Sequence, residues 1–190
     1  MTAVTLNLNA ITTLTHDQFW ELSLTNRDVR LELTAQGELI VMPPTGWESG
    51  KRNSSLNGQL WNWNERTRVG ISFDSSTGFI LPNGAVRSPD TAWVASERLI
   101  ALNPNPEGFL PLAPDFVIEL RSATDRLKPL QEKMREYHAN GVRLGWLLNP
   151  QDQTVEIYRA GKEVEVMRSP TELSGEDVLP GFVLSLKGIF

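Results

Sequence analysis

Hydrophobic residues recur along this chain with two different spacings, and the spacing separates predicted helices from predicted strands. Leu56, Leu60 and Trp63 follow one another at intervals of four and three, which is the period of one helix face. Another such stripe ends just before Gly141, a residue type that favours the position directly after a helix. The helices predicted in this way are 16–22, 47–68 and 127–140.

Shorter segments alternate apolar and polar residues, as strands with one buried face do. Two of them flank a turn at Gly37 and predict a β-hairpin. The segments 115–121, 127–140 and 142–148 follow in the order strand, helix, strand, which predicts a crossover between parallel strands. The strands predicted are 30–34, 38–42, 71–74, 78–81, 91–94, 115–121, 142–148, 155–158 and 164–167.

This order of elements predicts an α/β or α+β fold, in which a mixed β-sheet is flanked by helices and preceded by an N-terminal β-hairpin extension. A length of 190 residues suits a single domain, 1–190. No apolar run approaches the roughly 18 residues of a membrane span, and the N-terminus lacks the pattern of a signal peptide. A cytoplasmic location with no membrane contact is therefore expected.

Composition restricts the chemistry that the chain can perform. A hydrophobic fraction of 40% and a charged fraction of 22% are typical of a soluble globular protein. With no cysteine and only two histidines, any metal must be held mainly by oxygen. A net charge of -5 argues against tight, non-specific binding of nucleic acid, although it leaves room for a local basic groove.

Glu119 stands inside an apolar segment that otherwise has the marks of a buried strand. Val117 and Glu119 share one strand face, whereas the alternate residues point to the other. An ionised carboxylate in a core costs several kcal/mol unless a cation, a proton or a metal compensates it. Glu119 is therefore expected either to face a cleft or to be salt-bridged in the core.

A second acid, Asp90, follows a proline at the boundary between a turn and a strand. Two carboxylates from adjoining strands are candidates to hold Mg²⁺ for metal-assisted hydrolysis, although a turn aspartate often bonds to its own backbone instead. Arg121 shares a strand face with Glu119, where its guanidinium is suited either to a phosphate or to Glu119 itself. Lys133 adjoins the apolar stripe of its helix and is expected to reach toward the strand, whereas a solvated helix lysine is the more common case.

An acid after a proline, an acid in an apolar strand, and a basic residue on that strand or the next helix together resemble the PD-(D/E)xK nuclease superfamily. More narrowly, most of the chain resembles the Uma-two type of restriction endonucleases within that superfamily. The segments that carry the resemblance are 43–46, 88–90, 114–119, 146–150 and 155–158, with Ser122, Asp125, Lys133, Tyr137, Gly141 and Val142.

The resemblance implies a restriction-endonuclease-like fold, with Asp90 and Glu119 as ligands of Mg²⁺ or Mn²⁺. The superfamily places a lysine two residues after the second acid, where this chain has Arg121, which stays protonated. In some branches the lysine migrates to the following helix, so Lys133 is expected to supply the amine. Glu48 resembles an additional acid beside the metal, although acids also favour the N-terminus of a helix.

The sequence therefore predicts a metal-dependent endonuclease that hydrolyses phosphodiester bonds in DNA. A homodimer is expected because two-fold symmetry lets one small domain cut both strands, and Trp61 and Trp63 are candidates for the contact. One alternative is a catalytically inactive nuclease fold that binds DNA or protein, which the substitution at Arg121 and the acidic composition favour. A second alternative is a structural domain in which Glu119 is merely paired with Arg121.

Overall fold

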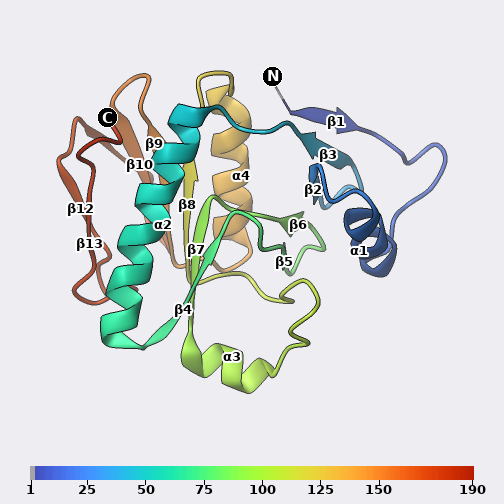
Figure 1. Cartoon of the computed structure of the whole chain (residues 1–190), viewed down its shortest axis with the longest axis horizontal. Coiled ribbons are helices and arrows are strands. Elements are labelled where there is room, and N and C mark those ends of the chain that lie inside the picture. Colours follow the sequence, from blue (N-terminus) through green and yellow to red (C-terminus); the bar gives the residue numbers. More distant parts are fainter. Residues whose placement is uncertain (1–2) are drawn as a thin grey trace.

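The structure is a computed structural model that describes residues 3–190, and its strands form a large sheet, a small sheet and a short hairpin (Figure 1). The large sheet contains, in spatial order, β11 (Glu165–Arg168), β10 (Thr154–Arg159), β9 (Leu144–Asn149), β8 (Phe116–Leu120), β7 (Thr91–Ala95) and β4 (Gly70–Asp74). The small sheet contains β1 (Val4–Leu6), β3 (Leu39–Met42), β2 (Arg30–Leu33), β6 (Val86–Arg87) and β5 (Phe79–Ile80). The hairpin pairs β12 (Glu172–Ser174) with β13 (Val183–Ser185). The helices are α1 (His16–Thr25), α2 (Trp47–Thr67), α3 (Ser96–Leu102) and α4 (Leu127–Ala139).

The crossover predicted from the sequence is confirmed. β8 and β9 are parallel and are joined through α4, whereas the other neighbouring strands of the large sheet are antiparallel. Every residue of β8 is buried, which explains its nearly continuous apolar sequence. Its side chains alternate as predicted, because Phe116 and Ile118 join one hydrophobic cluster and Val117 joins another.

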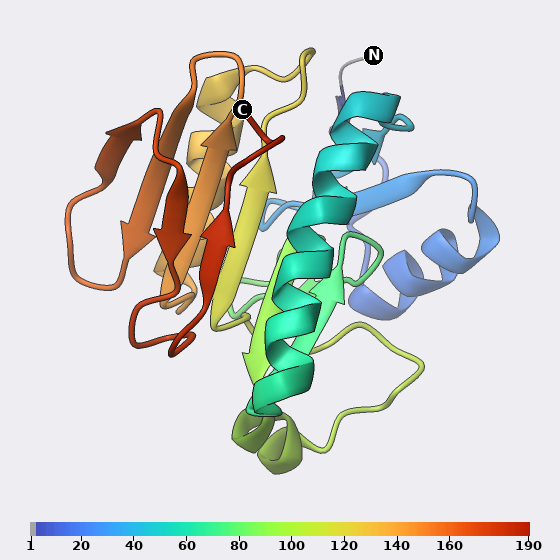
Figure 2. The same cartoon turned by 60° about the vertical axis from the view of Figure 1, so that its left-hand side comes forward.

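The large sheet is covered on both faces, which places two helices on opposite sides of β8. Leu56 and Leu60 of α2 pack into the same cluster as Phe116, together with side chains of the C-terminal hairpin. Met134 of α4 packs with Val117 on the other face. Figure 2 shows α2 and the C-terminal strands in front of the sheet and α4 behind it.

Close packing of α4 against the large sheet depends on Gly145 of β9. A Cβ added at Gly145 would lie 2.6 Å from Met134 Cε and 3.3 Å from Val117 Cγ2, so a larger residue would force α4 or its side chains to move. Since Lys133 precedes Met134 on α4, this contact also sets how near Lys133 lies to the sheet.

The predicted N-terminal hairpin forms as β2 and β3 and is extended into the small sheet by strands from both sides. Phe19 of α1 packs with Leu33, Leu39 and Val86 in a core that belongs to this sheet. The chain runs from β6 of the small sheet directly through 88–90 into β7 of the large sheet. The junction of the two sheets therefore lies at Asp90.

Several elements were not predicted, and each is too short or too exposed to leave a periodic signal. The strands β1, β6, β12 and β13 contain two or three residues each, and α3 has no buried residue. The strand predicted at 142–148 begins two residues later, at Leu144. Within residues 3–190, none of the helices combines the length and the apolar character needed to cross a membrane.

We expect Gly58→Ala to stabilise the protein by about 1 kcal/mol, because Gly58 lies in the interior of α2, where alanine loses less conformational entropy on folding. A Cβ at this position meets nothing within 4 Å. Urea denaturation measures the change in the free energy of unfolding. Gly141→Ala is the matched control: its Cβ also meets nothing within 4 Å, but Gly141 has a φ of 100°, so this substitution is expected to destabilise the fold. A loss of stability in Gly58→Ala would contradict the placement of Gly58 in the interior of α2.

Candidate active site at the junction of the two sheets

Asp90 is held in one orientation by contacts from two elements. Its Oδ2 accepts a hydrogen bond of 2.8 Å from the backbone N–H of Leu120, and its Oδ1 accepts one of 3.0 Å from Asn53 Nδ2 of α2. Asn57 Nδ2 donates to the Asp90 backbone carbonyl at 3.0 Å. Burial raises the pKa of Asp90, and the hydrogen bond from Leu120 only partly offsets this effect. The turn aspartate is therefore anchored by neighbouring elements rather than by its own turn.

Glu119 lies across from Asp90 on the neighbouring strand. Thr91 pairs with Ile118, so one further step in this antiparallel register places Asp90 opposite Glu119, on the same face of the sheet. The Glu119 side chain is buried, with 4% of the residue exposed. Burial is the main reason that its pKa rises to about 7, and the nearby charge of Asp90 raises it further against the opposing effect of Lys133.

Two side chains of α4 contact the same oxygen of Glu119. Tyr137 donates its hydroxyl to Oε1 at 2.9 Å, and the Lys133 Nζ lies 2.8 Å from Oε1. Burial and the negative charge of Glu119 raise the pKa of Tyr137, so the phenol remains a hydrogen-bond donor. The Glu119 carboxylate is thus held by two side chains of α4.

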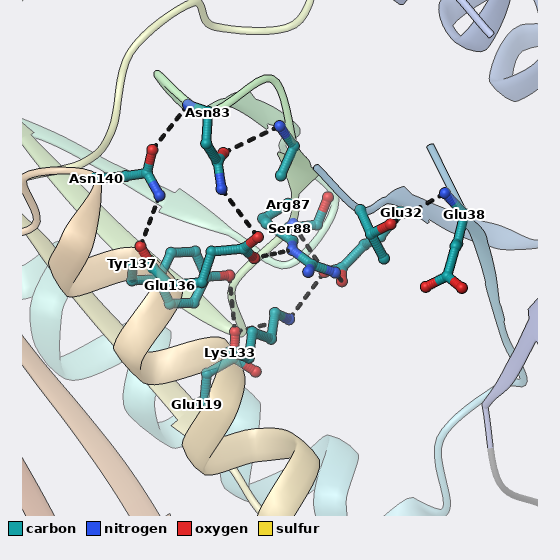
Figure 3. A network of polar contacts seen from close by, with 12 residues as sticks. Glu32, Glu38, Asn83, Arg87, Ser88, Glu119, Lys133, Glu136, Tyr137 and Asn140 are labelled. Atoms are coloured by element: carbon teal, nitrogen blue, oxygen red, sulfur yellow. Dashed lines mark hydrogen bonds and ion pairs between the residues drawn. The ribbon is translucent and has the colours of Figure 1, made fainter. Parts of the chain in front are cut away.

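Lys133 reaches from α4 to the acids, as the sequence predicted for the direction of its side chain. Its Nζ lies 2.8 Å from Glu119 Oε1 and 2.8 Å from Glu32 Oε1 (Figure 3). Burial opposes the charge on Lys133, but these two carboxylates outweigh burial and hold its pKa above the usual value. Lys133 is therefore an ammonium ion at neutral pH.

Glu32 of β2 belongs to this site and was not predicted from the sequence. Its Oε1 accepts from Lys133 and, at 2.9 Å, from the Ser88 backbone N–H, while its Oε2 lies 3.1 Å from Arg87 Nη1. Burial opposes ionisation of Glu32, but Lys133 and Arg87 hold its pKa below the usual value. The alternation of this strand predicted one buried face, formed by its apolar residues. The opposite face is also covered in the structure, which no local pattern in the sequence indicates.

The network extends along α4 through a second ion pair. Arg87 Nε contacts Glu136 Oε2 at 2.6 Å, and Asn83 Nδ2 donates to Glu136 Oε1 at 3.1 Å. Asn140 accepts from the Asn83 backbone N–H at 2.8 Å. Figure 3 shows these contacts as one connected set that joins α4 to the small sheet. These contacts of Arg87 and Asn83 fix the position of α4 relative to β2 and β6.

Arg121 lies away from this network, so the suggested pairing between Arg121 and Glu119 is wrong. Its Nη1 contacts Asp152 Oδ2 at 3.1 Å and Asn149 Oδ1 at 3.2 Å, and its Nε donates to the backbone carbonyl of Asp125 at 3.1 Å. Because the residue follows the last position of β8, its long side chain can turn toward the loop between β9 and β10. Arg121 braces that loop.

Glu48 is also not assembled with the two acids. Its side chain is 60% exposed and lies 3.0 Å from Arg52, one turn further along α2. In the part of the chain that the structure describes, residues 3–190, no group of three or more histidine, cysteine or acidic side chains is arranged to hold a metal. The expectation of a third acid at the site is therefore not met by Glu48.

The residues present nevertheless fit a hard divalent cation. Asp90 and Glu119 offer carboxylate oxygens, the ligands that Mg²⁺ and Mn²⁺ prefer, and their mutual repulsion is relieved by a cation between them. Asn53 Oδ1 is buried beside Asp90 without a hydrogen-bond partner. An acceptor that lacks a donor is suited to a cation or to its bound water.

Comparison with known proteins identifies the fold and the family. The mixed sheet and its crossover helix form a restriction-endonuclease-like fold. Residues 16–187 match the model of the Uma2 family, described as "Putative restriction endonuclease", and the chain belongs to this family. A crystal structure from Anabaena variabilis ATCC 29413, described as "a putative nuclease belonging to DUF820", shares the fold with a TM-score of 0.77 and 22% sequence identity, over 93% of this chain and 97% of that chain. No curated protein gives a significant match.

We expect the metal-free Glu119→Gln variant to gain stability relative to the parent as the pH rises from about 4.5 to 8. The pKa of Glu119 is about 7 in the folded state, against a usual value of 4.5, so between these pH values the folded state binds more protons than the unfolded chain. The contribution of Glu119 to stability is therefore lost as the pH rises, by about 3 kcal/mol in total. Glutamine does not ionise and avoids this loss.

Urea denaturation of both proteins at several pH values measures the difference. Glu165→Gln is the control, because Glu165 is half-exposed on the edge strand β11 and belongs to an unrelated ion pair. Addition of Mg²⁺ is expected to reduce the advantage of Glu119→Gln, since the cation stabilises the carboxylate. A difference between Glu119→Gln and the parent that is the same at pH 4.5 and pH 8 would show that the pKa of Glu119 is not raised.

Proposed function

We propose that the chain is a metal-dependent endonuclease that hydrolyses phosphodiester bonds in DNA. The observation that supports this function best is the meeting of Asp90, Glu119 and Lys133 at the junction of the two sheets, with Lys133 Nζ 2.8 Å from Glu119. Membership of a family of restriction endonucleases supports nuclease function independently of this geometry.

Asp90 and Glu119 are the residues that would hold Mg²⁺ or Mn²⁺. A divalent cation bound there supplies a water of lowered pKa and neutralises charge on the scissile phosphate. Asp90 is prepared for this role by its hydrogen bonds to Leu120 and Asn53, which fix its carboxylate before any ligand binds. Glu119 is prepared by Tyr137 and Lys133, which hold its Oε1.

Lys133 acts in this proposal as a positively charged hydrogen-bond donor. Its raised pKa excludes the role of a proton acceptor at neutral pH, because two carboxylates stabilise its protonated form. An ammonium ion in this position orients the attacking water and stabilises negative charge as it develops on the phosphate. Glu32 contributes by holding the Lys133 ammonium group on the side of the small sheet.

Other parts of the proposal rest on the sequence alone. A role for Arg121 in phosphate binding requires its guanidinium to leave Asp152 and Asn149. A homodimer stays a prediction, and Trp63 is unsuited to the contact because it is buried, whereas Trp61 is 54% exposed. The cytoplasmic location is likewise a prediction.

We expect the purified protein to nick or cut duplex DNA in the presence of Mn²⁺ or Mg²⁺, and EDTA to abolish cutting. Asp90→Asn and Glu119→Gln are expected to lower the rate by orders of magnitude, because each removes a metal ligand while keeping the size of the side chain. Gel assays of a supercoiled plasmid measure the rate, and filter binding measures DNA affinity, which should change little.

Glu165→Gln again serves as a control that retains the parent activity. If both variants of the acids cut as fast as the parent, the cutting belongs to another site or to a contaminant. If the parent cuts no DNA with either metal, an inactive nuclease fold that binds DNA or protein becomes the better description.

We expect Lys133→Met to slow the chemical step more strongly than Arg121→Ala. Lys133 contacts Glu119 directly, whereas the Arg121 side chain is engaged at the loop between β9 and β10. Single-turnover rates at saturating enzyme separate the chemical step from DNA binding. Circular dichroism is the control for folding, since Lys133→Met leaves two buried carboxylates without their cation. Equal rates for Lys133→Met and the parent would exclude Lys133 from the reaction.

A further inference from the structure

Only the nitrogen of the Asn53 side-chain amide forms a hydrogen bond within residues 3–190. Nδ2 donates to Asp90 Oδ1 at 3.0 Å, whereas Oδ1 is buried and has no hydrogen-bond partner among these residues. A buried acceptor without a donor costs about 1–3 kcal/mol, so it is uncommon in a folded protein and calls for a physical explanation. The unpaired oxygen lies beside one of the two acids that are proposed to hold a metal.

The distance between Asn53 and Asp90 matches the spacing of two ligands on one cation. Oxygen ligands of Mg²⁺ lie at about 2.1 Å from the ion in an octahedral arrangement, so adjacent ligands are about 3.0 Å apart. The Asn53 nitrogen lies 3.0 Å from Asp90 Oδ1. Rotation of the amide by half a turn exchanges its nitrogen and oxygen, so that Oδ1 takes this ligand spacing and Nδ2 takes the buried position that Oδ1 occupied.

A neutral oxygen also suits the charge of this site. Asp90 and Glu119 already repel each other, and a third carboxylate would add to that repulsion in the metal-free protein. An asparagine provides a hard oxygen ligand for the cation without a further negative charge. When no cation is present, its N–H group instead stabilises Asp90.

We infer that Asn53 supplies the third protein oxygen of the metal site, in the place expected for Glu48. The amide donates its N–H to Asp90 in the metal-free state and turns its Oδ1 to the cation when Mg²⁺ or Mn²⁺ binds. This inference rests on the proposed function, since it requires a metal at Asp90 and Glu119.

Asn57 provides a matched control one turn further along α2. Its Nδ2 donates to two backbone carbonyls, those of Asn53 and Asp90, both at 3.0 Å. Asn57 therefore braces the same region but contacts no carboxylate of the site. Asn57→Ala measures the effect of losing a structural contact alone. Asn53→Ala removes a structural contact and the proposed metal ligand together.

Titration calorimetry of the metal-free full chain with Mn²⁺ at pH 8 tests the inference, with thermal melts with and without Mn²⁺ as a second readout. Asn53→Ala is expected to weaken Mn²⁺ binding about tenfold, and Asn57→Ala much less. Asn53→Asp keeps an oxygen ligand at this position but removes the N–H donor. If Asn53 is a ligand, aspartate binds Mn²⁺ at least as tightly as the parent, while its metal-free form melts at a lower temperature because two carboxylates then adjoin.

If the amide only braces Asp90, Asn53→Ala weakens Mn²⁺ binding no more than Asn57→Ala, which removes a structural contact alone. That result, or parent-like binding by Asn53→Ala, overturns the inference. The parent and Asp90→Asn test the proposed function separately. Binding that is lost in Asp90→Asn but unchanged in Asn53→Ala refutes only the role of Asn53, whereas a parent that binds no Mn²⁺ refutes both.

Discussion

The ammonium group of Lys133, held between two carboxylates, is the interaction on which the rest of the site depends. It lies 2.8 Å from Glu32 of the small sheet and 2.8 Å from Glu119 of the large sheet. Lys133 itself comes from α4, so three elements meet at one buried positive charge. Removal of one partner from such a buried pair commonly costs about 3–5 kcal/mol, because the remaining charge stays away from water. The same contact therefore joins the two sheets and sets the position of the acids.

The acids of the site reduce the stability of the metal-free protein. Burial raises the pKa of Asp90 and brings that of Glu119 to about 7, so both carboxylates resist the charge that a metal requires. Acids that are held in this way are frequent at functional sites, where a ligand relieves the repulsion. Glu32 differs from them, because two cations hold it ionised. Asp90 and Glu119 are thus the two acids proposed to hold a cation, whereas Glu32 is paired with both Lys133 and Arg87.

The different roles of Arg121 and Lys133 follow from the shape of the two side chains. Arg121 presents a planar fork of donors, and it uses them on Asp152, Asn149 and a backbone carbonyl to brace a loop. A compact ammonium is better suited to fill the space between two carboxylates, and Lys133 supplies it from the opposite side. Gly145 supports this arrangement because its lack of a side chain lets α4 lie close to the sheet.

The sequence by itself determined the elements whose periodicity reports a buried face. The stripe of α2, the crossover through α4 and the alternation of β8 that isolates Glu119 were all visible, because each depends on residues a few positions apart. Only the tertiary structure decided what covers a polar face. The alternation of β2 predicted only one buried face, yet Glu32 on the other face is buried, and its partner Lys133 lies 101 residues away along the chain. Glu48 has the favourable position at a helix start but remains exposed. A local pattern shows that a side chain is charged, whereas the packing of distant elements determines whether that charge meets water, an ion pair or a neighbouring acid.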